Sequence, residues 1–228
     1  MDDRSTPDGQ GDAWAAVSVV GPDALDYLQS QVSQDLQTEG DWPRWSLVLN
    51  PDGTVVSAGL VDIVESGFDI VVPEATADAV LTRLLRFRLR SRCELSVRRA
   101  VRGPYENEAD RVRAGWPGPG EFSADLVPQC FGDQFVRRTV SFTKGCFTGQ
   151  ELVGRLDARG SSVPWRLVRA QGRSVDEIDA FLKSKGPAGP SGVTSWISGE
   201  STTIGLGFAH RTLLNESPPT GLALETLD

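Results

Sequence analysis

Apolar residues follow strand-like and helix-like spacings in turn along the first hundred residues. Trp14 to Val20 is short, apolar and rich in β-branched residues, which predicts a buried strand. Gly21-Pro22 ends that strand, and apolar residues at helical spacing predict a helix over 22–33. The same rules predict strands over 44–50, 55–64, 68–72 and 93–97, a turn over 50–53, and a long helix from Pro73-Glu74 onward. The order β-α-β-β-β-α-β indicates an α+β domain close to a ferredoxin-like split β-α-β unit.

The pattern is weaker over 98–138 and then changes character. A strand is expected over 137–142, ahead of a segment with two glycines. Beyond Gly160, short β segments separated by glycine and proline are predicted over 165–170, 193–197 and 204–209. The last of these alternates large and small side chains, which favours a small barrel. The predicted organisation is a disordered tail (1–11), an α+β domain (12–163) with a subdomain break near 100–104, and a small C-terminal β-barrel (164–228).

The composition is that of a globular protein, with 39% hydrophobic and 24% charged residues in a chain of 228. No run of 18 apolar residues is present, and the N-terminus lacks a basic start and an apolar stretch, so neither a membrane span nor a secretory leader is expected. Three widely spaced cysteines favour a reducing cytosol over a disulfide framework. With a single histidine, they do not make a structural metal site, which needs about four ligands.

Charge is distributed unevenly along the chain, whose net charge is −8. Residues 1–80 contain two arginines and fifteen acidic residues, whereas residues 83–113 contain ten arginines and four acidic residues. An acidic protein of this kind is a poor general nucleic-acid binder. The arginine-rich strip has two interpretations: a site for an anionic ligand or partner, or a solvated face that pairs with the acidic half.

The segment with the strongest chemical signal surrounds Cys146. Thr148 and Glu151 have the spacing of a capping box, which predicts a helix from about Gly149 that ends near Gly160. A helix N-terminus and the charge of Lys144 both favour a thiolate, so Cys146 is a candidate reactive thiol. Its other interpretation is a small buried residue in a tight turn. His210 is the only histidine and lies far along the chain, which argues against a Cys-His hydrolase.

The segment 144–151, K-G-C-F-T-G-Q-E, resembles the K-G-C-Y-x-G-Q-E signature of the YgfZ family, with Phe147 in place of tyrosine. Residues 14–24 and 27–35 resemble the family's opening strand and helix, and residues 49–53 resemble its L-N-x-x-G turn. Residues 87–91 are similar to its arginine-bearing helix end, and residues 192–195 to its G-x-V-T-S segment. The family consists of folate-binding proteins of iron–sulfur cluster assembly or repair, related to the glycine-cleavage T-protein.

The resemblance implies an aminomethyltransferase-like, folate-binding α+β fold with a small C-terminal β-barrel and a tetrahydrofolate in a central channel. Cys146 and Lys144 would be the functional thiol and its neighbouring cation. The implied folate contacts are Trp14, Gly149, Gln150, Glu151 and Arg155. Trp14 also fits a plain core position, and the polar residues also fit helix capping and surface charge. No metal ligand is implied.

The sequence departs from the T-protein pattern at the positions of an aspartate pair, where Ser57 and Ala58 stand. A second family tryptophan would fall at Asn107, and the middle region is short. These departures favour an accessory factor over an enzyme. The leading hypothesis is a cytosolic, tetrahydrofolate-binding factor whose partners are iron–sulfur client or assembly proteins, with no nucleic-acid or membrane partner. The alternatives are a folate-dependent one-carbon transferase and a scaffold that has lost folate.

Overall fold

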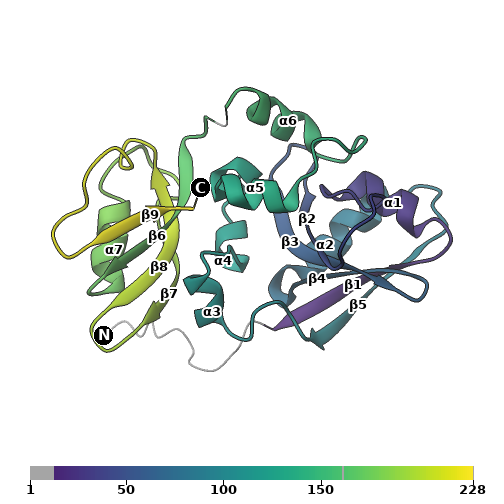
Figure 1. Ribbon diagram of the computed structural model, residues 1–228, viewed down its shortest axis with the longest axis horizontal. Helices are drawn as coiled ribbons and strands as arrows, with labels where there is room; N and C mark the ends of the chain where they lie inside the picture. The colour runs from purple at the N-terminus through teal and green to yellow at the C-terminus, as the bar shows by residue number, and fades with distance from the viewer. Residues whose placement is uncertain (1–12, 161, 228) are drawn as a thin grey trace.

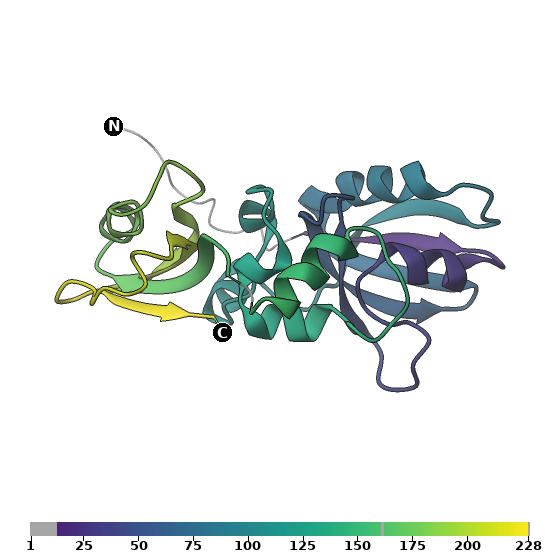
Figure 2. The ribbon, with the colours of Figure 1, turned by 90° about the horizontal axis from the view of Figure 1, so that it is seen from above.

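The computed structural model describes residues 13–160 and 162–227, so the predicted tail at 1–11 lies outside the described residues. Figure 1 shows two β-sheets at opposite ends of an elongated molecule, with short helices between them. The view from above in Figure 2 shows the same separation, with α7 at the far end of the second sheet. None of the helices in the described ranges combines the length and apolar character that a membrane span requires.

The first sheet has five antiparallel strands in the order β2-β3-β4-β1-β5. The elements of this part are β1 (Trp14–Val20), α1 (Ala24–Gln31), β2 (Arg44–Leu49), β3 (Val55–Val64), β4 (Gly67–Pro73), α2 (Glu74–Phe87) and β5 (Glu94–Val101). Because β4 and β5 are both antiparallel to β1, they run parallel to each other, and α2 connects them across β1. This is the predicted split β-α-β unit, extended by two strands.

One face of this sheet is covered by α1 and α2. The side chains that alternate toward the helices, such as Val17, Ile70 and Val61, are fully buried or nearly so. Tyr27 on α1 donates a hydrogen bond to the carbonyl of Leu84 on α2, at 2.6 Å, so the two helices are held together. The period-two pattern of the strands and the 3.6-residue pattern of the helices meet in one core, as the sequence predicted.

The middle of the molecule is built from short helices, of which the sequence predicted only the last. They are α3 (Glu108–Arg113), α4 (Pro119–Phe122), the 3₁₀ helix η1 (Pro128–Phe131), α5 (Asp133–Thr139) and α6 (Gln150–Ala158). The strand expected over 137–142 was wrong, because Phe135, Val136 and Thr139 are buried at helical spacing on α5, which packs against β2. A core of aromatic and aliphatic side chains runs from β2 and β3 through these helices to the second sheet.

The second sheet contains four antiparallel strands in the order β7-β8-β6-β9, with α7 packed on one face. Its elements are β6 (Trp165–Gly172), α7 (Val175–Leu182), β7 (Gly192–Ser198), β8 (Thr203–His210) and β9 (Ala223–Thr226). The outer strands β7 and β9 do not pair in the described part of the chain, so the sheet is open. The predicted barrel is therefore not formed there: closure needs pairing between β7 and β9, and β9 has only four residues.

Candidate functional site

The Cys146 loop, defined as residues 144–148, is fastened at its first residue to the end of α1. The Lys144 ammonium donates hydrogen bonds to the carbonyl oxygens of Val32, at 2.7 Å, and Gln34, at 2.8 Å. Its Nζ also lies 5.3 Å from the centroid of the Phe147 ring. Lys144 therefore connects the loop to a segment more than a hundred residues earlier in the chain.

Thr148, the last residue of the loop, is also hydrogen-bonded to the end of α1. The backbone N–H of Thr148 donates to the carbonyl of Ser30 at 3.0 Å, and its hydroxyl donates to the Gln31 amide oxygen at 3.4 Å. The following residue, Gly149, has φ of +85°, and a Cβ there would lie 2.5 Å from the carbonyl oxygen of Asn50. Glycine is thus required at 149 by both the backbone conformation and the close approach of the β2–β3 turn.

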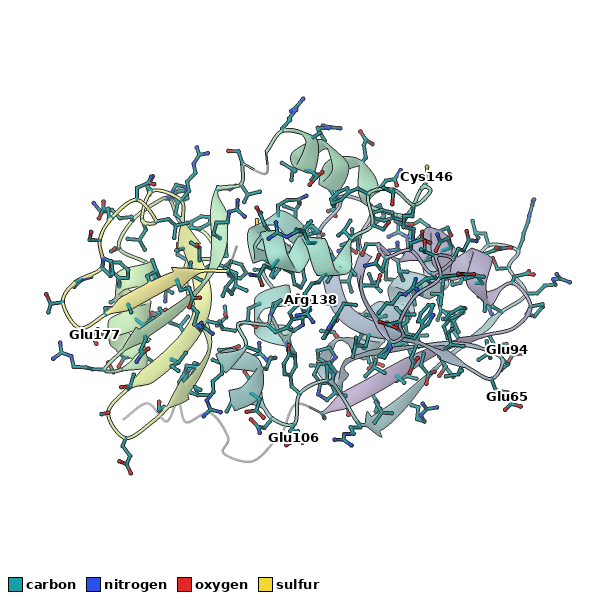
Figure 3. The ribbon with its side chains drawn as sticks, viewed as in Figure 1. Glu65, Glu94, Glu106, Arg138, Cys146 and Glu177 are labelled. Carbon is teal, nitrogen blue, oxygen red and sulfur yellow. The ribbon has the colours of Figure 1, made fainter. Side chains whose placement is uncertain are left out.

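Between these two anchors the loop carries Cys146 outward. The thiol is exposed, whereas Cys93 and Cys130 are buried. Gly145 beside it has no atom within 4 Å of where a Cβ would stand. Figure 3 shows the Cys146 side chain pointing away from the body of the protein. The interpretation of Cys146 as a buried turn residue is therefore wrong, and the thiol is open to solvent.

A pocket of about 400 Å³ lies beside the thiol. Phe142 is the most exposed of its aromatic side chains, at 45%. The Gln150 amide oxygen accepts a hydrogen bond from the N–H of Phe147 at 3.1 Å, which orients the side chain at the pocket. The lining residues are Ser141, Phe142, Lys144, Gly145, Cys146, Phe147, Gln150, Glu151 and Gly154. The site thus combines a thiol, an ammonium, an amide, a carboxylate and aromatic surface.

Burial lowers the pKa of the Lys144 ammonium to about 8, and the negative charge of Asp35 opposes this shift. The cause is desolvation, because carbonyl oxygens replace water around the charge without neutralising it. The hydrogen bonds of Lys144 are made to α1, so the structure gives this residue a clear part in holding the loop.

The helix behind the loop begins as predicted but is capped differently. Gly149 is the N-cap of α6 and no side chain caps the helix, so the expected capping box of Thr148 and Glu151 is not formed. The reason is that the Thr148 hydroxyl is used by Gln31. Glu151 is exposed and pairs with Arg155 one turn later, at 2.6 Å, with their side chains 87% and 51% exposed.

The structure brings together four of the seven residues that the sequence nominated: Lys144, Cys146, Gln150 and Glu151. Gly149 supports the loop from behind, and Arg155 touches the site through Glu151. Sequence reasoning missed Phe142 and the end of α1. An apolar residue between two polar ones, Ser141 and Thr143, was the available signal for Phe142. The α1 contacts had no local signal.

Trp14, the seventh nominated residue, is not among the residues that line this pocket. It is 4% exposed at the start of β1, and Gly103 lies so close that a Cβ there would meet the indole ring at 2.2 Å. Its buried Nε1 has no hydrogen-bond partner in the described part of the chain. An unpaired buried donor is uncommon in folded proteins and is a feature that a ligand acceptor would satisfy.

The positions of the missing aspartates lie deep in the structure. The Ser57 hydroxyl shares a hydrogen bond of 2.8 Å with the Thr76 hydroxyl, and Ala58 is 1% exposed in the middle core. Among the described residues, no group of three or more histidine, cysteine, aspartate and glutamate side chains is arranged to hold a metal ion.

Comparisons with known proteins show which fold the chain resembles. No family model matches the chain. A Haemophilus influenzae protein described as uncharacterized is 36% identical over 56 residues, which is 24% of this chain and only 20% of that protein. The crystal structure of the glycine cleavage system aminomethyltransferase T from Bartonella henselae superimposes with a TM-score of 0.55 and 14% identity, over 95% of this chain and 82% of that chain. This likeness shows that the chain adopts a fold like that of the aminomethyltransferase.

Proposed function

We propose that this protein binds tetrahydrofolate and supports the assembly or maintenance of iron–sulfur proteins through the thiol of Cys146. The observation that carries the proposal is the exposed thiol, held between two anchored residues beside a pocket with mixed polar and aromatic lining. The fold of the aminomethyltransferase and the resemblance of residues 144–151 to a folate-binding family support the same conclusion. The thiol suits a reducing compartment, so the cytosol is the proposed location.

The residues beside Cys146 fit the chemistry of a pterin. A pterin ring stacks on aromatic surface, which Phe142 offers, and its edge pairs with an amide or a carboxylate, which Gln150 and Glu151 offer. The pocket volume of about 400 Å³ is within the range of small-molecule sites. Lys144 adds a cation near the site for an anionic tail. Trp14 would contribute only if a ligand acceptor reached its unpaired N–H.

In this proposal Cys146 acts on a partner protein. A stable cluster usually needs about four ligands, and Cys146 stands alone on the surface. Its exposure allows a protein-bound sulfur or cluster ligand to approach it directly. The bound folate would supply one-carbon or redox chemistry at the neighbouring pocket, while the chain's own residues position the thiol and the pterin.

The folate part is tested by isothermal titration calorimetry with tetrahydrofolate. We expect saturable binding that is at least about tenfold weaker in Gln150→Ala, because one edge contact of the pterin is lost, a difference of about 1.4 kcal/mol. Arg159→Ala is the matched control, because that exposed residue follows α6 and is not among the residues that line the pocket. Absence of heat at millimolar ligand would support the scaffold hypothesis instead.

A second titration separates the two candidate folate contacts. Trp14→Phe removes the unpaired indole N–H and keeps an aromatic ring on β1. If the pterin is held at the Cys146 pocket alone, this variant binds tetrahydrofolate like the parent protein. A loss comparable to that of Gln150→Ala would mean that the ligand extends to the start of β1.

The thiol part is tested in cells that lack the protein. Cys146→Ser should fail to restore the activities of iron–sulfur enzymes under oxidative stress, although the exposed position makes the change structurally mild. Restoration to the parental level would overturn the role of the thiol. Cys93→Ser, at a buried cysteine, controls for the loss of any thiol.

The fold also favours a second candidate, a folate-dependent one-carbon transferase, because the structural neighbour is an aminomethyltransferase. Such a reaction needs an acid or base near the transferred carbon. Ser57 and Ala58 supply no carboxylate at the positions where the resemblance places one. Release of a one-carbon unit from a methylamine donor with added tetrahydrofolate would establish this alternative.

A further inference from the structure

One end of the first sheet carries an unusual surface. Of the five large hydrophobic side chains that are exposed in residues 13–160 and 162–227, four belong to this part of the molecule: Leu25 (36%), Ile63 (54%), Leu85 (43%) and Leu89 (78%). They lie on the beginning of α1, on β3 close to its turn into β4, and at the end of α2. We call this surface the distal end.

Hydrogen bonds show that these segments meet. The N–H of Gly21 donates to the carbonyl of Ser66 at 3.0 Å, which joins the start of the α1 segment to the β3–β4 turn. The carboxylate of Asp23, just before α1, accepts the N–H of Arg92 at 2.7 Å and pairs with its guanidinium at 2.9 Å. Arg92 follows α2, so the distal end is one continuous region of the surface.

The end of α2 supplies the cationic part of the distal end. Arg86, Arg88 and Arg90 are exposed, and none of them forms an ion pair with a carboxylate in the described part of the chain. Leu85 and Leu89 alternate with them along the same segment. Three arginines and two exposed leucines therefore occupy the same short segment, in which Arg88 also donates a hydrogen bond to the carbonyl of Cys93 at 2.7 Å.

The neighbouring segments supply the anionic part. Asp26, Glu65 and Glu94 are exposed and form no ion pair among the residues that the structure describes. Figure 3 shows Glu65 and Glu94 at the extremity of the first sheet. Ile63 precedes Glu65 by two residues in the sequence, so an exposed apolar side chain and an exposed carboxylate occur together at this end of β3.

We propose that the distal end binds a second copy of this chain in a two-fold symmetric dimer. The surface carries three arginines and three carboxylates that have no ion-pair partner among the described residues, together with exposed leucine and isoleucine side chains. In an isologous interface the basic segment of each copy meets the acidic segment of the other, so one surface satisfies itself. The exposed leucines and isoleucine would form the apolar centre, and the charges would form the rim.

The same features disfavour polyanionic partners. Nucleic acid or an anionic membrane would face the carboxylates of Asp26, Glu65 and Glu94 as well as the arginines, and the protein has a net charge of −8. A partner of mixed charge with its own apolar residues satisfies both segments. The chain's own distal end has this chemistry.

Sedimentation equilibrium of the full chain tests the proposal. We expect a mass twice that of the 24.6 kDa chain at high protein concentration, with dissociation favoured as salt rises from 0.1 to 1 M. Leu89→Glu should weaken the dimer at least about tenfold, because it places a charge at the apolar centre. Arg137→Glu is the control for an exposed charge change elsewhere and should leave the dimer intact. A single-chain mass for the parent protein at every concentration would overturn the proposal.

A charge swap tests the two-fold geometry and does not depend on a lost fold. Arg86→Glu with Arg90→Glu makes the distal end mostly acidic and leaves Arg88 in place. Glu65→Arg with Glu94→Arg makes it mostly basic and leaves Asp26 in place. Each variant should be monomeric alone, and an equimolar mixture should form a heterodimer. A mixture that remains monomeric, from variants whose circular dichroism matches the parent protein, would contradict the proposed pairing.

Discussion

The Cys146 loop and the segment 192–195, which both resemble sequence signatures of one family, differ in the exposure of their polar groups. The Cys146 loop is anchored at both ends and carries its thiol into solvent. The segment 192–195 places its hydroxyl groups in a buried network instead. There the Glu121 carboxylate accepts hydrogen bonds from Ser195, at 2.7 Å, and from the N–H of Gly118, at 2.7 Å, and pairs with Arg111 at 3.1 Å.

The network around Glu121 holds parts of the fold together and is closed to solvent. Arg111 is 1% exposed and Glu121 is fully buried, so this network joins the middle helices to β7 and offers no open group. In the Cys146 loop, the polar groups of Lys144 and Thr148 hydrogen-bond to the end of α1, and the thiol of Cys146 is exposed. Resemblance to a signature therefore does not show whether a residue is exposed or buried, and the contacts of the tertiary structure decide it.

The largest expected contrast is in thiol reactivity. In the native protein, iodoacetamide should modify Cys146 orders of magnitude faster than Cys93 and Cys130, because burial excludes the reagent and raises the pKa of the Cys130 thiol to about 12. Mass spectrometry should find one modified cysteine under native conditions and three in denaturant. Native labelling at Cys130 would contradict the burial of that residue, and Cys146→Ser should abolish native labelling.

The buried network should respond strongly in stability. Glu121→Ala removes the buried carboxylate partner of Arg111 and leaves the partly exposed Glu108 paired with it, which should cost about 2–4 kcal/mol in the free energy of unfolding. Urea denaturation measures the change. The matched control is Glu151→Ala, which removes an exposed ion pair and should cost less than about 0.5 kcal/mol. Equal effects would mean that the network does not join the two parts of the fold.

The support of the Cys146 loop is tested at Gly145, inside the loop, and at Gly149, directly after it. Gly149→Ala forces a Cβ into the carbonyl of Asn50 at a positive φ and should destabilise the protein by about 2–4 kcal/mol. Gly145→Ala adds the same methyl group where no atom lies within 4 Å and should change stability by less than about 0.5 kcal/mol. Thermal denaturation distinguishes them, and equal melting temperatures would show that the β2–β3 turn does not constrain the loop.

The smallest predicted effect concerns pH. The pKa of Lys144 is about 8 in the folded protein, below its ordinary value of 10.5, so between these values the unfolded chain binds more protons and stability rises with pH. This contribution should reach about 1–2 kcal/mol. It is measured as the difference between the parent protein and Lys144→Met across pH 8 to 10, which cancels the titration of other groups. Parallel curves would indicate that the ammonium is not desolvated.

Much of the first sheet could be predicted because its signals are local. The strands and helices up to residue 97 follow from period-two and 3.6-residue patterns, and the structure places each within a few residues of the prediction. Residues 133–142 show the limit of this reasoning. Val136 and Val140 suit a strand by composition, but contact with β2 selects a helix in which Phe135, Val136 and Thr139 are buried together.

The second sheet shows a related limit. Three of its strands were predicted, over 165–170, 193–197 and 204–209, as short β segments between glycine and proline, but α7 and β9 were not. Whether a sheet closes depends on pairing between its first and last strands, and no local pattern specifies that pairing. The acidic and basic segments were also visible in the sequence, and the structure shows that some pair across elements, as Arg98 does with Asp69.

The sequence by itself determined the local features of this protein: the strand and helix periods, the glycines on either side of Cys146, and the separation of acidic from basic segments. The tertiary structure decided which of these residues are exposed to solvent and which are buried. Cys146 is exposed because Lys144 and Thr148 bind the end of α1, and Trp14 is covered because Gly103 packs on its ring. Periodicity constrains residues a few positions apart, whereas exposure here depends on contacts between residues about a hundred positions apart.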